Sequence, residues 1–244
     1  MTTDFIWLAS FVLISYTTLA ISGFGSVVIA ITLGAHLYPI EVLLPILVPL
    51  TLFVNSYIAI RYHDKIDTVV LFRKIIPFMG TGLFLGIIVF HLIQGMLLKK
   101  TFGLLIVILS IRELYRLSAK NPKPSSTSNV ASNIYIITAG IIHGIYASGG
   151  PLLVYAINKI GLNKSSFRST LSSLWLILNI VLTSFYIVSG KITADSVKST
   201  GMLLPVVLIG LIIGETLHRY IHEHFFKIFV FLILLFSGFS ILIK

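Results

Sequence analysis

Two glycine-containing breaks interrupt apolar stretches of this chain and carry the residues whose chemistry is considered first. The stretch ISGFGSVVIAI spans residues 21–31, and GIYASGGPLLV spans residues 144–154. Glycine permits a turn, and Pro151 suits the first position of a new helix because its missing N–H costs nothing there. We expect each break to begin a short helix, near Ser26 and over residues 151–160, whose free N–H groups and positive dipole end favour an anion.

The predicted anion site combines backbone donors with polar side chains that lie in apolar sequence. Backbone N–H groups and hydroxyls at the breaks give the candidates Ser22, Gly23, Gly25, Ser26, Ser148, Gly149 and Gly150. Asn55 and Asn179 lie midway along apolar segments, where each either donates to the anion or joins two helices; we place both in the site. His143 lies one turn before the second break. Its expected role is that of an anion ligand, a proton carrier or a neutral imidazole hydrogen-bonded between helices.

A cluster near the C-terminus offers a different chemistry. It has the i, i+4 histidine spacing that can bind a metal, and it consists of Glu215, His218, His222 and His224. Together with His143 it supports the alternative of a membrane-embedded, metal-dependent enzyme or accessory protein. The histidines have no counterparts in the other half of the chain, whereas the breaks do. We therefore expect no enzyme, no metal site and no cofactor.

The composition indicates an integral membrane protein. The chain of 244 residues is 57% hydrophobic and 11% charged, and several apolar runs approach or exceed the roughly 20 residues that cross a bilayer as helix. The net charge of +10 is better explained by basic loops that face the cytoplasm than by binding of nucleic acid. No GxxxxGK[ST] motif occurs, so the sequence indicates no built-in ATPase.

The chain divides into two similar halves. Residues 118–133 are rich in Ser, Asn, Pro and Lys, which predicts an exposed linker between a first repeat over 1–117 and a second over 134–244. An offset of 128 residues aligns Pro77, Gly82 and Gly86 with Pro205, Gly210 and Gly214, and an offset of 126 aligns the two breaks. Internal repeats are a feature of transporters.

The distribution of Lys and Arg favours breaks that enter and leave on the same side. With two such re-entrant hairpins, 13 of the 18 basic residues fall on one side, leaving Lys99, Lys100, Lys191, Lys198 and Lys244 opposite. The positive-inside rule then places the linker in the cytoplasm and both termini outside. The predicted fold is all-α, with two inverted repeats that each contain a broken, re-entrant helical hairpin and three transmembrane helices.

Several short motifs resemble the sulfite exporter TauE/SafE family of membrane permeases. They are the repeated glycine-rich break, FRSTL at 167–171, Asn179, SGKI at 189–192 and the Pro-x4-Gly-x3-Gly pattern at 205–214 with its first-half counterpart. The resemblance covers nearly the whole chain. It implies an inner-membrane permease for small sulfur-containing anions, and it implies that Arg168 binds the anion bidentately at the cytoplasmic mouth. Without it, Arg168 is one more positive-inside charge. Phe24 departs from the glycine-rich pattern, which predicts unequal half-sites.

These observations predict a secondary transporter in the cell inner membrane. It carries a small sulfur-containing anion, such as sulfite or a sulfonate, bound between the two broken-helix N-termini near the membrane midplane. The expected partners are this anion and the lipid bilayer, with no nucleic acid. Coupling to a proton or another ion is left open, as is the oligomeric state.

Overall fold

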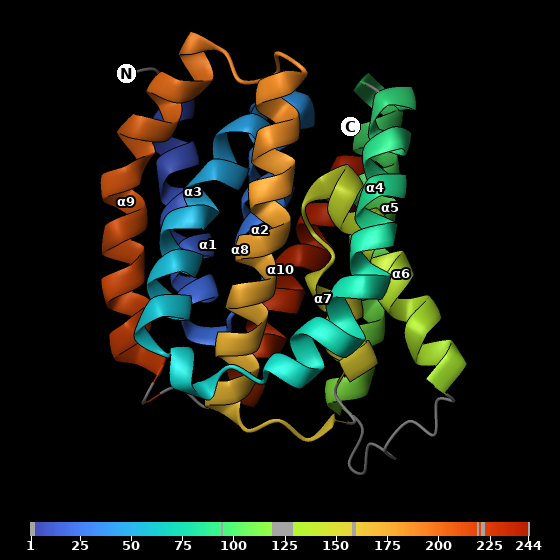
Figure 1. Ribbon diagram of the computed structural model, residues 1–244. Coiled ribbons are helices and arrows are strands. Elements are labelled where there is room, and N and C mark those ends of the chain that lie inside the picture. Colours follow the sequence, from blue (N-terminus) through green and yellow to red (C-terminus); the bar gives the residue numbers. More distant parts are fainter. Residues whose placement is uncertain are drawn as a thin grey trace.

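The protein is helical throughout the part that the structure describes. The computed structural model covers residues 3–93, 95–118, 129–157, 160–218, 220 and 223–243, and only the backbone at 129 and 223–227. Within these ranges there are ten α-helices and no strand, which confirms the predicted all-α class (Figure 1). In chain order they are α1 (Thr3–Ser22), α2 (Ser26–Gly34), α3 (Ile40–Arg61), α4 (Ile76–Leu92), α5 (Gly95–Ser118), α6 (Asn129–Tyr146), α7 (Gly150–Ile157), α8 (Lys164–Val188), α9 (Ala194–His218) and α10 (Glu223–Ile243).

The lengths and surfaces of the helices are those of a membrane protein. Among the described residues, five helical segments are long and apolar enough to cross a bilayer, namely α1, α3, Val70–Leu92, α8 and α9. The third of these begins with a π-helical turn that runs directly into α4. Large apolar side chains lie exposed on the outer helices, including Phe84 at 61%, Ile212 at 67% and Phe236 at 73%. Such a surface fits lipid, so the chain is a multi-pass membrane protein.

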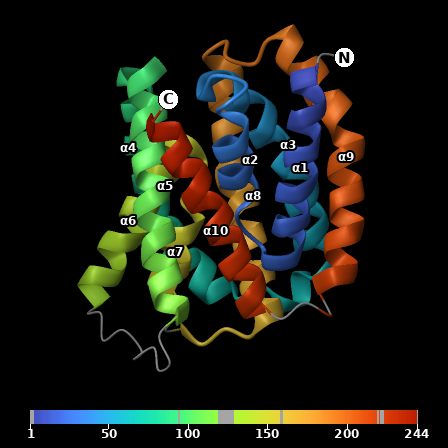
Figure 2. The same cartoon turned by 180° about the vertical axis from the view of Figure 1, so that it is seen from behind.

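Each predicted break separates a long helix from a short one that turns back. α1 has 20 residues and α2 has 9, while α6 has 18 and α7 has 8. Figures 1 and 2 show α2 returning toward the end of the bundle where α1 begins, and α7 returning toward the opposite end, where α6 begins. The second short helix starts at Gly150, one residue before the predicted start, and is described as far as Ile157, so the predicted end at residue 160 is not tested. Both chain termini lie at the end from which the first hairpin starts (Figure 1).

The principal helix contacts form matched pairs. α4 packs against α6 and α9 packs against α1, while α3 packs against α8 and α5 against α10. If α1–α5 correspond in order to α6–α10, the first two contacts exchange with each other, and the last two map onto themselves. This is the pattern that two related halves would produce. The inverted relation between the halves stays a prediction.

Glycines occupy equivalent places in two of these interfaces. A Cβ at Gly82 or Gly86 would overlap backbone carbonyl oxygens of α6, so α4 and α6 touch through their backbones. A Cβ at Gly214 would overlap Ala20 of α1, and one at Gly210 would also press on the α1 backbone. Small residues allow such close approach of membrane helices. The glycine matches at the 128-residue offset therefore mark two corresponding helix contacts.

The two breaks use glycine for different physical reasons. Gly23 and Gly25 have φ angles of 80° and 97°, in the left-handed region that residues with a Cβ rarely adopt. In the second break the left-handed residue is Ala147, with φ of 50°. Gly149 is required there because a Cβ would overlap the carbonyl oxygen of Ala139 on α6. The second turn is thus made by an alanine, and its glycine provides a close contact.

Candidate anion-binding site

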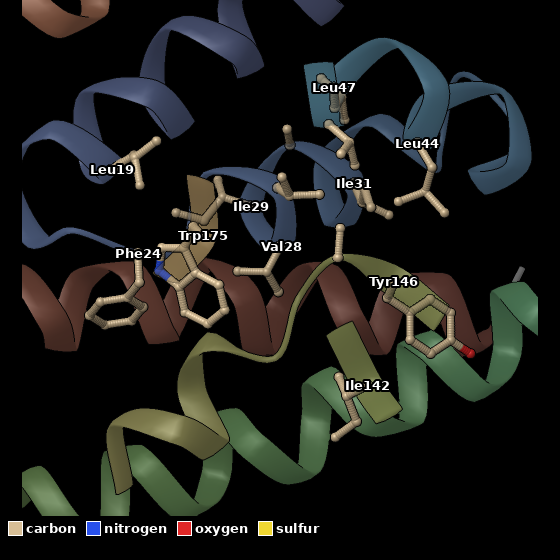
Figure 3. Close-up of a cluster of buried hydrophobic side chains, with 14 of the residues drawn as sticks. Leu19, Phe24, Val28, Ile29, Ile31, Leu44, Leu47, Ile142, Tyr146 and Trp175 are labelled. Carbon is tan, nitrogen blue, oxygen red and sulfur yellow. The ribbon is translucent and has the colours of Figure 1, made fainter. Parts of the chain in front are cut away.

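A small cavity lies between the two breaks. It has a volume of about 30 Å³, which leaves space for about two waters or a small ion. Its walls come from the end of α1, both breaks, the starts of α2 and α7, and α3, α6 and α8. Figure 3 shows Leu19, Phe24, Val28 and Trp175, four of its apolar lining residues, gathered beside the first break. The polar side chains in the lining are Ser26, Thr51, Asn55, His143, Ser148 and Asn179.

The structure brings most of the predicted site residues to this one cavity. Seven of them line it, namely Gly25, Ser26, Asn55, His143, Ser148, Gly150 and Asn179. They come from both halves of the chain and from both breaks. Phe24 also lines the cavity and faces Gly150, where a Cβ would lie 3.3 Å from the phenyl ring. The two sides of the cavity therefore differ in shape.

Four predicted residues do not line the cavity. The Ser22 hydroxyl lies 2.8 Å from the Thr18 carbonyl oxygen, to which it donates within its own helix. Gly23 packs against α8, where a Cβ would lie 2.9 Å from the Arg168 Cα. Gly149 abuts α6 as described above. These two glycines therefore shape the breaks, and their part in anion binding stays a prediction.

Arg168, the fourth, is engaged at the linker end of the bundle. Its side chain is 3% exposed and forms an ion pair with Glu215 of α9. Tyr62, just beyond α3, donates to the second carboxylate oxygen at 2.7 Å, and its ring lies 5.2 Å from the Arg168 guanidinium carbon. This hydrogen bond, with partial burial, raises the pKa of Tyr62. In this conformation the guanidinium holds three helices together and does not reach the cavity, so anion binding by Arg168 stays a prediction.

A directed hydrogen-bond chain crosses the cavity wall from α3 to α6. The Thr51 hydroxyl donates to the Val48 carbonyl oxygen at 2.7 Å and accepts from Asn179 Nδ2 at 2.8 Å. The Asn179 Oδ1 atom then faces His143 Nε2 at 3.0 Å, and an amide oxygen can only accept. His143 therefore carries its proton on Nε2 and donates it to Asn179. The imidazole also stacks on Trp175, with ring centroids 5.0 Å apart.

Three buried polar atoms next to the cavity have no hydrogen-bond partner in the described structure. They are Nδ1 of His143 and both the oxygen and nitrogen of the Asn55 amide, on side chains that are 1% and 0% exposed. Buried polar atoms in native proteins are nearly always bonded, and an unpaired one costs about 1–3 kcal/mol. The first N–H groups of α2 and α7 likewise have no partner within their helices. The cavity thus presents polar groups that a ligand would satisfy.

Two site residues were not predicted to act as they do. Thr51 orients Asn179 through a hydrogen bond. The 128-residue offset that aligns Pro77 with Pro205 also relates Thr51 to Asn179, so the repeat could have indicated this residue from the sequence. Trp175 donates its indole N–H to the Gly23 carbonyl oxygen at 2.9 Å, which fixes the first break against α8. That pairing joins residues far apart in the chain and has no local signal.

The C-terminal metal cluster is not assembled among the described residues. Glu215 is occupied by Arg168 and Tyr62, and His218 Nδ1 donates to the Ile21 carbonyl oxygen at 2.6 Å. No group of three or more His, Cys, Asp or Glu that could hold a metal occurs in the described part of the chain. His222 and the side chain of His224 lie outside it.

Comparison with known proteins identifies the family. No match was found among curated proteins or solved structures. The family model described as "Sulfite exporter TauE/SafE" matches residues 7–241, almost the entire chain. The match spans both breaks and all the helices that form the cavity, so the protein belongs to the sulfite exporter TauE/SafE family of membrane transporters.

Proposed function

We propose that this protein is a secondary transporter for a small sulfur-containing anion, such as sulfite or a sulfonate, bound in the cavity between the N-termini of α2 and α7. Membership of the family supports a membrane permease of the sulfite or sulfonate type and not an enzyme. The metal-dependent alternative is therefore not retained. The observation that carries the site is the pair Asn55 and His143, whose buried polar atoms lack partners and border the cavity.

The chemistry of the cavity suits a small anion. Two helix N-termini direct N–H groups and positive dipole ends toward it, and Asn55 adds an amide donor. In the described part of the chain, no charged side chain belongs to its lining. Hydrogen bonds to a charged ligand are worth about 1.5–3 kcal/mol each, so several donors can hold an anion without a counter-charge. Such a site releases its ligand more readily than one built on a buried arginine.

An inverted relation between the halves would place the anion on the symmetry axis. Thr51 and Asn179, which the 128-residue offset relates, hydrogen-bond to each other beside the cavity. Two residues that a two-fold axis relates can contact each other only if both lie close to that axis. We infer that the axis passes through the site, as in transporters that expose one central site alternately to each side.

The linker end of the site is closed by contacts that would have to separate. The Gly23 backbone lies against Arg168, which is tied to Glu215 and Tyr62. Movement of the first hairpin relative to α8 would open this end, and we propose that the ion pair stabilises the closed arrangement.

Counterflow in proteoliposomes tests the function. Vesicles loaded with unlabelled sulfite should accumulate labelled sulfite, and a panel of sulfate, thiosulfate, short sulfonates and carboxylates defines the substrate range. The matched variant is Asn55→Leu, which should insert normally and lose counterflow. Accumulation of a carboxylate but no sulfur oxyanion would contradict the proposed substrate class.

Orientation in the membrane is tested by cysteine labelling, since the chain has no natural cysteine. We propose that the linker is cytoplasmic and that both termini lie outside. Lys99→Cys and Pro39→Cys should both label from outside, because Pro39 is exposed and follows the first hairpin, which returns to the end where the termini lie (Figure 2). Cytoplasmic labelling of Pro39→Cys alone would mean that the first broken segment crosses fully.

A further inference from the structure

Resting on the proposed function, we infer that the anion is bound together with one proton, shared between Nδ1 of His143 and an oxygen of the anion. The bound anion and its proton together then have the net charge of a monoprotonated oxyanion. This goes beyond an anion site formed by helix ends, because it specifies what accompanies the anion.

The orientation of the imidazole carries this inference. The chain from Val48 through Thr51 and Asn179 fixes the proton of neutral His143 on Nε2. The other ring nitrogen, Nδ1, is buried, unpartnered and presents a lone pair. An oxygen of a fully ionised oxyanion is also only an acceptor. The two lone pairs repel each other unless one proton lies between them.

Surrounding groups offer no other place for this proton. Among the described residues, His143 is the one titratable residue in the cavity lining, where α3 contributes Thr51 and Asn55 and α8 contributes Trp175 and Asn179. α4, which also packs against α6, meets the α6 glycines through backbone atoms at Met79, Gly82 and Leu83. With the cavity empty, no described lining residue carries a negative charge that would compensate a buried imidazolium, so the neutral ring is the expected form.

Two arrangements satisfy the geometry and have the same composition. In one, a monoprotonated oxyanion donates its O–H to neutral His143. In the other, an imidazolium donates Nδ1–H to the dianion. Either way, one proton from the buffer forms a new O–H or N–H bond, and the occupied site holds one proton that the empty site and the free dianion lack.

Proton uptake on binding tests the inference. Sulfite is titrated calorimetrically into the purified full-length protein at alkaline pH, where it is the dianion, in buffers of different ionisation enthalpy. The slope of the observed enthalpy against buffer enthalpy should correspond to about one proton taken up per sulfite. Affinity should also fall as pH rises.

Two variants separate this proton from a structural role of His143. His143→Phe keeps a ring against Trp175 but removes the acceptor, so any remaining sulfite binding should occur without uptake. Asn179→Asp places a carboxylate at Nε2 and should hold the imidazole protonated beforehand, so that any sulfite binding that remains takes up much less than one proton. Sulfite binding to the wild type without uptake overturns the inference but leaves the transporter proposal intact. A wild type that binds none of the anions overturns both.

Discussion

Replacing Asn55 with leucine should make the protein more stable and less able to bind its anion. The amide is 0% exposed, and both of its polar atoms lack partners. Removing an unsatisfied buried amide should recover about 1–3 kcal/mol of folding free energy. The adjoining cavity of about 30 Å³ can take part of the extra side-chain volume. At about 2–4 °C per kcal/mol, the melting temperature should rise by roughly 2–12 °C.

The same substitution removes a donor to the bound anion. Loss of a hydrogen bond to a charged ligand is worth about 1.5–3 kcal/mol, or roughly a 10- to 150-fold weaker affinity. Thermal unfolding in detergent, recorded with and without sulfite, measures both effects on one sample. The apo melting temperature should be above that of the wild type, and the sulfite-induced shift should be smaller.

Ser172→Ala is the matched control. Its hydroxyl is also buried and unpartnered, but Ser172 does not line the cavity. This variant should be at least as stable as the wild type and should retain the full response to sulfite. If Asn55→Leu binds sulfite as tightly as the wild type, the assignment of Asn55 to the site is wrong.

Three further single substitutions, and one double mutant, test the account of the fold. Gly86→Ala should lower stability by about 1–3 kcal/mol because its Cβ would overlap α6, and it should not change the sulfite affinity of the folded protein. Thermal unfolding measures the stability, and calorimetry measures the affinity. A melting temperature equal to that of the wild type would contradict the close contact. Ala147→Gly should relieve the strain of the left-handed backbone and raise stability by about 0.5–1 kcal/mol in the same unfolding assay. A loss of stability would contradict strain at Ala147. Arg168→Gln should destabilise by about 1–3 kcal/mol, because the partly buried Glu215 loses its charged partner. Adding Glu215→Gln should recover much of this loss, and a double-mutant cycle with additive effects would refute the coupling.

The breaks and several cavity residues were predictable because their signals are local. Glycine and proline interrupt an apolar run in a way that the sequence displays directly, and Asn55, His143 and Asn179 are conspicuous as polar residues in apolar segments. The repeat added the expectation that the two breaks lie together. Both breaks do line the same cavity.

Pairings between distant segments could not be predicted. The partner that occupies Arg168 is Glu215, 47 residues further along the chain, and no local pattern links them. The left-handed turn at Ala147 was hidden because alanine gives no sign of such a conformation. The glycine pattern of the second break therefore indicated a turn correctly but not which residue makes it.

The most direct test of the central claim is to locate the bound anion. Selenite, the selenium analogue of sulfite, scatters X-rays anomalously and can be soaked into crystals of the wild-type protein. The account predicts an anomalous peak in the cavity between the two breaks, within hydrogen-bonding reach of Asn55 and His143. A peak at Arg168, with the cavity empty in a protein that transports selenite, would contradict it.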